Sequence, residues 1–332
     1  MNYIGSKYKL SKFIKAEIKA VVGETKDKIF CDLFAGTGAI ARAFKLDSKR
    51  VIANDIEYYS FVLNRNYIGN HERLNWHEHI DELNQLDGVD GFIYKHYCLG
   101  SGSGRQYFSD ENGRRIDAIR QKIETWKDSK HITENQYYYL LASLLEHADA
   151  VANTASVYGA FLKKLKKTAL KSLWLKPAVF DVNDVEHAVF NADANNLVKK
   201  LEGDILYLDP PYNHRQYGSN YHLLNTISRY DDFTPAGKTG LRQYERSLWC
   251  QKDAVENRFE SLIKSANFRF IFLSYNNEGL MSPTVIQKIM SKYGSYEVRE
   301  TNYQRFKADT DENRNHKAIN TTEFLHVLEK NF

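Results

Sequence analysis

Apolar and polar residues alternate along the chain in a way that predicts an α/β protein. Short apolar runs bounded by glycine, proline or polar residues are typical of buried strands, and apolar residues three or four positions apart are typical of amphipathic helices. In the first part of the chain these patterns predict a helix through residues 10–18, a strand from 28, a helix ending near 44, a strand at 50–54 and a helix from 58 to about 67.

The alternation stops near residue 71 and resumes near residue 190. The stretch between is rich in charged and aromatic residues, and its clearest patterns are helical, at 116–126 and 134–151. After it, the patterns predict strands at 190–193, 204–209, 268–273, 296–300 and 322–328, and helices at 194–200, 223–230, 255–266 and 285–292. We therefore expect one α/β sheet with helices on both faces, formed by residues 1–70 and 191–332, and a mostly helical insert at 71–190.

The composition argues against several classes of protein. No run of about 18 apolar residues occurs, and the lysines near the N-terminus precede no apolar core, so neither a membrane span nor a secretory signal is expected. Cys31, Cys98 and Cys250 are too few and too scattered for a disulfide framework or a zinc site, which favours a reducing compartment such as the cytoplasm. The net charge of +4 permits a nucleic-acid partner without requiring one.

The stretch from Asp204 to Tyr212 is the main candidate for chemistry. Its apolar strand must end at Asp209 because two prolines follow, and open α/β sheets bind ligands at the carboxyl ends of their strands. The Asp209 carboxylate and the Pro210 carbonyl can accept hydrogen bonds from the amino group of a flipped base, on which the Tyr212 ring can stack. The alternative is an acidic strand end followed by a structural proline turn.

A second candidate is the glycine turn near residue 36. Gly36 and Gly38 allow the backbone to approach a ligand closely, and Asp55 follows the next strand at the spacing at which an acidic side chain meets ribose hydroxyls. Asp193, at a further strand end, can accept the amino group of an adenine ring, and Lys7 can supply a point charge. The turn fits a nicotinamide dinucleotide as well as an adenosyl ligand.

Three further polar segments are also considered for a functional role. A lysine cluster can follow a phosphate backbone or can form one solvated face of a helix; it comprises Lys163, Lys164, Lys166, Lys167 and Lys171. Residues 213–222 are expected to form a mobile loop in which His214 and His222 are loop histidines, so no metal site is expected. Residues 303–307 and 314–317 predict a basic turn that can contact DNA phosphates.

Together these motifs resemble those of the α-class, Dam-like DNA adenine-N6 methyltransferases known as the D12 class. The shared order is a leading Gly-x-Lys loop, the glycine turn, an insert and Asp-Pro-Pro-Tyr, although Ser6 stands where the family often has a second glycine before the lysine. The matching segments are Tyr3–Lys7, Asp32–Gly38, Asn54–Asp55, Asn191–Asp193, Asp209–Tyr212 and Leu273–Asn277, and residues 106–176 look like the family's characteristic insert.

The resemblance implies a Rossmann-like, class I S-adenosylmethionine-dependent methyltransferase sheet whose insert recognises the DNA target. It further implies a role for each of several residues toward the cofactor. Tyr3 and Lys7 would flank its methionine part; Phe34, Gly36 and Gly38 would wrap it; Asp55 would bind its ribose hydroxyls, Asp193 would lie beside its adenine ring, and Asp209 would face both cofactor and target base.

The function implied is site-specific methylation of N6 of a flipped adenine in duplex DNA, in a prokaryotic cytoplasm and in a restriction-modification or related system. Whether a restriction endonuclease accompanies the protein stays open. Methylation of cytosine N4 or of RNA adenine is an alternative, although an aspartate at position 209, where cytosine enzymes usually carry serine, favours adenine. A nicotinamide-dependent dehydrogenase would leave Asp209 to Tyr212 unexplained, and a DNA-binding protein without catalysis would have no need of the complete motif set.

Overall fold

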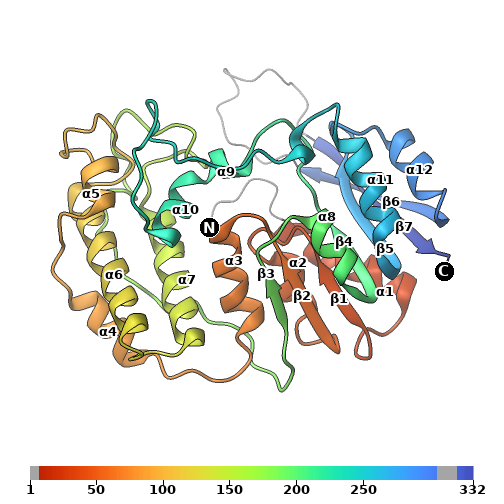
Figure 1. The fold of residues 1–332 in the computed structure, drawn as a ribbon, viewed down its shortest axis with the longest axis horizontal. Helices are drawn as coiled ribbons and strands as arrows, with labels where there is room; N and C mark the ends of the chain where they lie inside the picture. Colours follow the sequence, from red (N-terminus) through yellow and green to blue (C-terminus); the bar gives the residue numbers. More distant parts are fainter. Residues whose placement is uncertain (1–6, 305–319, 332) are drawn as a thin grey trace. The chain divides into compact units, whose positions relative to one another are not determined.

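The computed structural model describes residues 7–304 and 320–331, with the backbone alone at 302–304 and 320–321. The chain divides into two compact units, and each is described by itself (Figure 1). The sheet unit takes the described residues of Gly5–Ile56, Asn183–Gln216 and Arg246–Phe332. The helical unit takes Glu57–Val182 and Tyr217–Glu245. No helix in the described ranges is both long enough and apolar enough to cross a bilayer.

The sheet unit contains seven described strands in the order β3-β2-β1-β4-β5-β7-β6. Five neighbouring strands are parallel, and β7 lies antiparallel between β5 and β6. Their bounds are β1 Ile29–Asp32, β2 Arg50–Asn54, β3 Ala188–Phe190, β4 Glu202–Leu208, β5 Asn267–Asn276, β6 Gly294–Gln304 and β7 Asn320–Lys330. The carboxyl ends of β2, β1, β4 and β5 therefore share one edge of the sheet.

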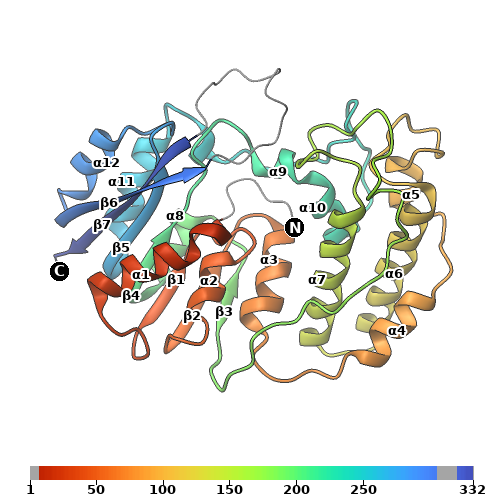
Figure 2. The same cartoon turned by 180° about the vertical axis from the view of Figure 1, so that it is seen from behind.

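Helices cover both faces of this sheet, as the sequence predicts (Figures 1 and 2). One face carries α1 Ser11–Val22 and α2 Ala39–Phe44; the other carries α8 Ala194–Leu197, α11 Val255–Ser265 and α12 Pro283–Met290. Successive strand residues point to opposite faces, so Phe30 stacks on Phe44 of α2 at 4.0 Å while Cys31 belongs to the core beneath α11 and α12. Burial on both sides explains why the centres of β1, β2 and β4 are apolar rather than alternating.

The helical unit packs its helices around a core of its own. Its described elements are α3 Tyr58–Asn64, which continues as the π-helical turn η2 Arg65–Gly69, then α4 His77–Gln85, α5 Phe92–Tyr97, α6 Asp110–Asp128, α7 Glu134–Val151, α9 Tyr217–Asn220 and α10 His222–Arg229. Serine and threonine caps explain where the two long helices begin. The Ser109 hydroxyl accepts from the Asn112 amide, and Thr133 forms a capping box with Gln136.

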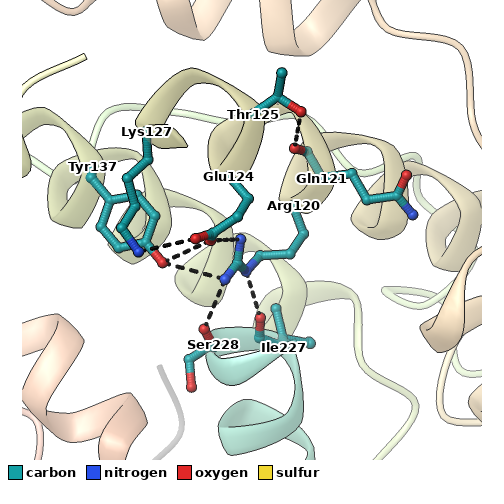
Figure 3. A network of polar contacts seen from close by, with 8 residues as sticks. All are labelled: Arg120, Gln121, Glu124, Thr125, Lys127, Tyr137, Ile227 and Ser228. Carbon is teal, nitrogen blue, oxygen red and sulfur yellow. Dashed lines mark hydrogen bonds and ion pairs between the residues drawn. The ribbon is translucent and has the colours of Figure 1, made fainter. Parts of the chain in front are cut away.

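A buried arginine ties three helices of this unit together (Figure 3). Arg120 of α6 is 2% exposed, and it donates to the Ile227 and Ser228 carbonyls at the end of α10, at 3.0 and 3.2 Å. It also pairs with Glu124 at 2.6 Å and donates to the hydroxyl of Tyr137 on α7 at 3.3 Å. Its guanidinium therefore supplies donors to helix-end carbonyls that have no partner within α10.

The prediction of one mobile loop at 213–222 is wrong, and the helix-face alternative for the lysine cluster is excluded. Residues 213–222 do not form one loop, because α9 occupies 217–220 and His222 begins α10. His222 is fully buried with Nε2 3.1 Å from the Tyr158 carbonyl, and burial lowers the pKa of its imidazole to about 4, so it stays neutral. The lysine cluster does not form a helix face either, since residues 152–187, all of which are described, contain no helix or strand. The predicted basic turn at 303–307 and 314–317 lies largely outside the described residues.

Candidate active site

The tip of β4 brings Asp209 to the carboxyl edge of the sheet. Residues 205–208 are buried, and the prolines at 210 and 211 have no amide hydrogen to continue the ladder, so the strand ends at Leu208. Beyond them, the Tyr212 carbonyl accepts a hydrogen bond from the Leu280 amide at 3.0 Å, which fixes the start of the following loop. The Asp209 side chain remains 18% exposed and can reach a ligand.

Asp209 shares a buried cation with a second carboxylate. The Lys7 ammonium lies 3.3 Å from Asp209 Oδ1 and 2.5 Å from Glu323 Oε1 of β7. Lys7 and Glu323 are more buried than Asp209, with side chains 8% and 9% exposed. Lys7 precedes α1, so three segments far apart in sequence meet at one point of the sheet edge.

The charges in this cluster oppose one another. Burial raises the pKa of Asp209 to about 7, since it disfavours the charged form; Lys7 lowers that pKa and the Glu323 carboxylate raises it. Burial by itself would lower the pKa of Lys7, but the two carboxylates outweigh burial and raise it above its ordinary value. Lys7 is therefore an ammonium ion at neutral pH, whereas Asp209 keeps its proton to a higher pH than an ordinary aspartate does.

The glycine turn leaves the neighbouring strand at the same edge. Gly36 and Gly38 have φ of 52° and 79°, in the left-handed region where other residues are strained, so glycine is required at both positions. The Gly36 amide donates to Asp55 Oδ2 at 2.8 Å, which joins the turn after β1 to the end of β2. Phe34 is half-buried with its ring edge-to-face against Trp249, 5.0 Å between centroids.

One acidic residue of the turn motif has an unsatisfied oxygen. Asp32, the last residue of β1, is buried and accepts from the Ala41 amide through Oδ2 at 3.2 Å; its Oδ1 makes no well-formed hydrogen bond in the described structure, although the Phe34 amide also lowers the pKa of this carboxyl. Burial, followed by the charge of Asp209, raises the pKa of Asp32. A buried acceptor without a donor is costly in a finished core, so it suits a site that a donor-bearing or cationic ligand completes.

Asp193 already has protein partners. Its Oδ1 caps α8 by accepting from the Asn196 amide at 3.0 Å, and its Oδ2 pairs with Arg258 of α11. Its predicted role beside an adenine ring therefore stays a prediction, in which the carboxylate would act together with these partners. Tyr3, the remaining predicted site residue, lies outside the described residues.

The structure thus brings most of the predicted residues to one edge of one sheet. The β1 register with β4 pairs Asp32 with Tyr207, so the turn carrying Gly36 and the loop carrying Asp209 leave adjacent parallel strands. Sequence reasoning missed Glu323, because one glutamate in a predicted strand has no local signal that distinguishes it. The sequence indicated Asp32 only as the first residue of the matching segment Asp32–Gly38.

In the helical unit, the lysine cluster lies on an irregular segment that buried asparagines hold in place. The Leu173 amide donates to Asn112 Oδ1 at 2.7 Å, and the Leu175 amide donates to Asn84 Oδ1 at 2.8 Å. The Leu173 and Leu175 side chains are buried, whereas Trp174 between them is 54% exposed. Residues 173–175 are therefore extended and fixed, with alternate side chains facing the core and the solvent.

Most of the cluster's lysines lie on the solvent side of this segment. Lys166 is partly buried and donates to the Thr154 carbonyl at 2.7 Å, and the exposed lysines are Lys163, Lys164, Lys167 and Lys171. Exposed lysines beside an exposed indole ring offer both charge and a stacking surface, which is a combination that nucleic-acid binding uses.

Comparison with known proteins decides the family. The sequence profile described as "D12 class N6 adenine-specific DNA methyltransferase" matches residues 3–289. The chain belongs to this family. It is 62% identical to the Type II methyltransferase M.NlaIII of Neisseria lactamica over 334 aligned positions, which cover all of both chains.

Two further relatives are also Type II methyltransferases. M.CviAII, a Type II methyltransferase of Paramecium bursaria Chlorella virus 1, is 40% identical across 93% of each chain. M.FokI of Planomicrobium okeanokoites is 40% identical across 93% of this chain and 50% of its own length. Among solved structures, TehB from Haemophilus influenzae aligns with 96% of this chain and 62% of its own at a TM-score of 0.39 and 8% identity, which is too weak to argue from.

The methyltransferase therefore acts on DNA adenine with S-adenosylmethionine as its cofactor, and its sheet is the Rossmann-like sheet of a class I methyltransferase, as the sequence predicts. The residues present fit that cofactor. Glycines at left-handed φ open the turn after β1, an unpaired acidic oxygen lies at the end of that strand, and Asp55 lies at the end of the next. These groups suit a ligand with a cationic sulfur and hydroxyl donors.

Proposed function

We propose that Asp209, Pro210 and Tyr212 form the acceptor side of methyl transfer, and that the target is an adenine flipped out of duplex DNA. The observation that supports this most directly is the strand arrangement. The loop carrying Asp209 and the turn carrying Gly36 leave adjacent parallel strands at one edge, so a base at the first can meet a cofactor at the second.

Activation of the amino group is the task left to the protein. The lone pair of adenine N6 is delocalised into the ring, which makes the nitrogen a weak nucleophile. S-adenosylmethionine, when bound, supplies a strongly electrophilic methyl group. The Asp209 carboxylate and the Pro210 carbonyl accept the two N–H groups of N6, draw the nitrogen toward tetrahedral geometry and localise its lone pair, while the Tyr212 ring stacks on the base.

The same acceptors stabilise the charge that develops during transfer. As the nitrogen–carbon bond forms and the carbon–sulfur bond breaks, positive charge moves onto N6, and an ionised Asp209 stabilises it by a few kcal/mol in a site shielded from water. The methylated N6 then loses one proton, which the Asp209 carboxylate can accept and pass to solvent. An ionised Asp209 is required because its neutral form is a poorer acceptor and carries no compensating charge.

The cofactor is proposed to occupy the glycine turn. Phe34, Gly36 and Gly38 would wrap it, and Asp55 would accept from its ribose hydroxyls while holding the Gly36 amide. Lys7, with Tyr3, would lie near its methionine part, Asp193 beside its adenine ring, and Asp209 between the cofactor and the base. The orphaned Oδ1 of Asp32 supports placing a cationic or donor group at this edge.

Recognition of the DNA site is proposed for residues 71–190. The exposed lysines and Trp174 of the irregular segment support this, since they can contact phosphates and stack on a base or sugar. The relatives M.NlaIII and M.CviAII are Type II methyltransferases. We infer that this enzyme protects a specific site in a cytoplasmic restriction-modification system, with a cognate endonuclease as a partner in that system.

The central test is Asp209→Ala. The variant should lose methylation of duplex DNA while it still binds S-adenosylmethionine, because the substitution removes the acceptor of N6 and leaves the glycine turn intact. Glu202→Ala is the matched control, since Glu202 is exposed at the opposite end of the same strand. Methyl transfer is measured with labelled cofactor and calorimetry measures its binding; turnover near the wild-type rate would refute the proposed role.

The same assays separate the alternatives. Digestion of the labelled DNA to nucleosides distinguishes N6-methyladenine from N4-methylcytosine, and an RNA duplex of the same sequence tests for RNA methylation. Sequencing the methylated positions in DNA from expressing cells identifies the recognition site.

A further inference from the structure

The Lys7 ammonium has two carboxylate partners, of which only Asp209 has a place in the mechanism. We propose that Glu323 is a positioning residue for methyl transfer: it holds the Lys7 ammonium beside Asp209 and, through its own charge, sets the fraction of Asp209 that is ionised. This inference rests on the proposed role of Asp209 as the acceptor of N6.

The topology explains how Glu323 reaches the site. Glu323 lies near the start of β7, opposite Asn276 at the end of β5, and β5 is the neighbour of β4. Because β7 is antiparallel to β5, the start of β7 lies at the sheet edge where the parallel strands end. Its carboxylate therefore faces the edge that carries Asp209, although Glu323 itself is two strands away from β4.

The Glu323 carboxylate lies closer to the Lys7 ammonium than the Asp209 carboxylate does. Its Oε1 is 2.5 Å from the ammonium, whereas Asp209 Oδ1 is 3.3 Å away. All three side chains are largely shielded from water, so the buried lysine needs a carboxylate partner to remain charged. Glu323 supplies that partner and leaves the Asp209 carboxylate less tightly bound, with oxygen capacity for a substrate amine.

The functional consequence of these contacts is an excess of negative charge around Asp209. One ammonium faces two carboxylates, and within ranges 7–301 and 322–331 the other titratable groups that interact with Asp209 are Asp32, Tyr207 and Tyr212, none of which is cationic. Among the described residues, Lys7 is the only cation paired with either Asp209 or Glu323. Glu323 therefore acts on Asp209 in two opposed ways: its charge repels that of Asp209 directly, and it holds near Asp209 the ammonium that stabilises the Asp209 charge.

Removing the charge of Glu323 has a predictable sign. The Glu323 carboxylate raises the pKa of Asp209 and Lys7 lowers it, so Glu323→Gln should move the acid limb of the pH–rate profile to lower pH, by about one unit. The glutamine oxygen can still accept a hydrogen bond from Lys7, which preserves packing. Lys7→Met should move the acid limb of the pH–rate profile to higher pH, because it removes the charge that lowers the pKa of Asp209.

The experiment measures single-turnover methylation of duplex DNA between about pH 5.5 and 9 by the wild type and each variant, at saturating S-adenosylmethionine. Glu329→Gln is the matched control, because Glu329 lies on the same strand but is exposed and pairs with Arg269. We expect its inflection to coincide with that of the wild type. Glu323→Gln should also bind the cofactor with little change in affinity.

The outcomes separate this inference from the proposed function. A folded Glu323→Gln enzyme that is slower at every pH with an unmoved inflection would assign Glu323 a structural role only and overturn the inference. If Glu323→Gln does not fold, Glu323→Asn removes the same charge from a shorter side chain, and the inflection must again move to lower pH; an unmoved inflection overturns the inference. If Asp209→Ala retains turnover, Asp209 is not the acceptor of N6, and the proposed function fails together with the inference about Glu323.

Discussion

Arg120→Met removes the guanidinium that joins α6 to the ends of its neighbours and leaves a side chain of similar length. Four contacts disappear: those to the Ile227 and Ser228 carbonyls, to the Tyr137 hydroxyl and to Glu124. Glu124 keeps Lys127 at 3.0 Å and the Tyr137 hydroxyl at 3.1 Å, so its carboxylate is not orphaned. The main loss is therefore the donors to two carbonyls at the end of α10 (Figure 3).

The expected magnitude follows from these contacts. A buried acceptor that loses its donor costs about 1–3 kcal/mol, and breaking a buried ion pair by removing one partner costs about 3–5 kcal/mol. Since Glu124 retains partners, we expect a loss of about 3–4 kcal/mol in the free energy of unfolding, a large share of the 5–15 kcal/mol that is roughly typical of domains.

Urea denaturation followed by circular dichroism checks this prediction through the unfolding midpoint. Arg114→Met is the matched control on the same helix, because Arg114 is only partly buried, pairs with Asp90 at 2.5 Å and stacks on Tyr94. The control should lose far less stability, since water can replace its contacts. If the two variants unfold at the same urea concentration, the guanidinium does not support the end of α10 in the way proposed here.

Two further predictions concern catalysis and DNA binding. With the pKa of Asp209 at about 7, the ionised fraction of Asp209 decreases as the pH is lowered past that value. The single-turnover rate of the wild type should therefore drop about tenfold per pH unit at more acid pH and level off above pH 8. A flat profile from pH 6 to 8 would contradict this prediction. For DNA, replacing Lys167 and Lys171 together by alanine should reduce the slope of log affinity against log salt by about 2, measured by fluorescence anisotropy. Lys26→Ala, on the exposed surface of the sheet unit, is the control, and an unchanged slope in the double variant would remove these lysines from the interface.

Local sequence determined the elements of the sheet and the point at which the key strand ends. Strands buried on both faces must be apolar throughout, so β1, β2 and β4 were recognisable, and the strand at 50–54 matches β2 residue for residue. The double proline after Asp209 fixed the end of β4 for a reason that involves no other part of the chain. Left-handed φ at Gly36 and Gly38 is likewise a property of two positions.

Elements without a strong periodic signal were missed. Neither α4 nor α5 was predicted, because both are short and most of their residues are polar or aromatic. The lysine cluster was open to a helical interpretation, but its residues 167–170 form only a turn, and the asparagines on α4 and α6 bind the backbone that follows, at Leu173 and Leu175.

Only the tertiary structure decided the electrostatics of the site. Lys7 and Glu323 are 316 positions apart, and nothing near either residue indicates that they meet. Their contact depends on the order of the strands, which sets β7 antiparallel beside β5 and so turns its start toward the edge where β4 ends. Periodicity reports how each segment meets its immediate surroundings, whereas the charge on a catalytic carboxylate depends on every segment that packs against it.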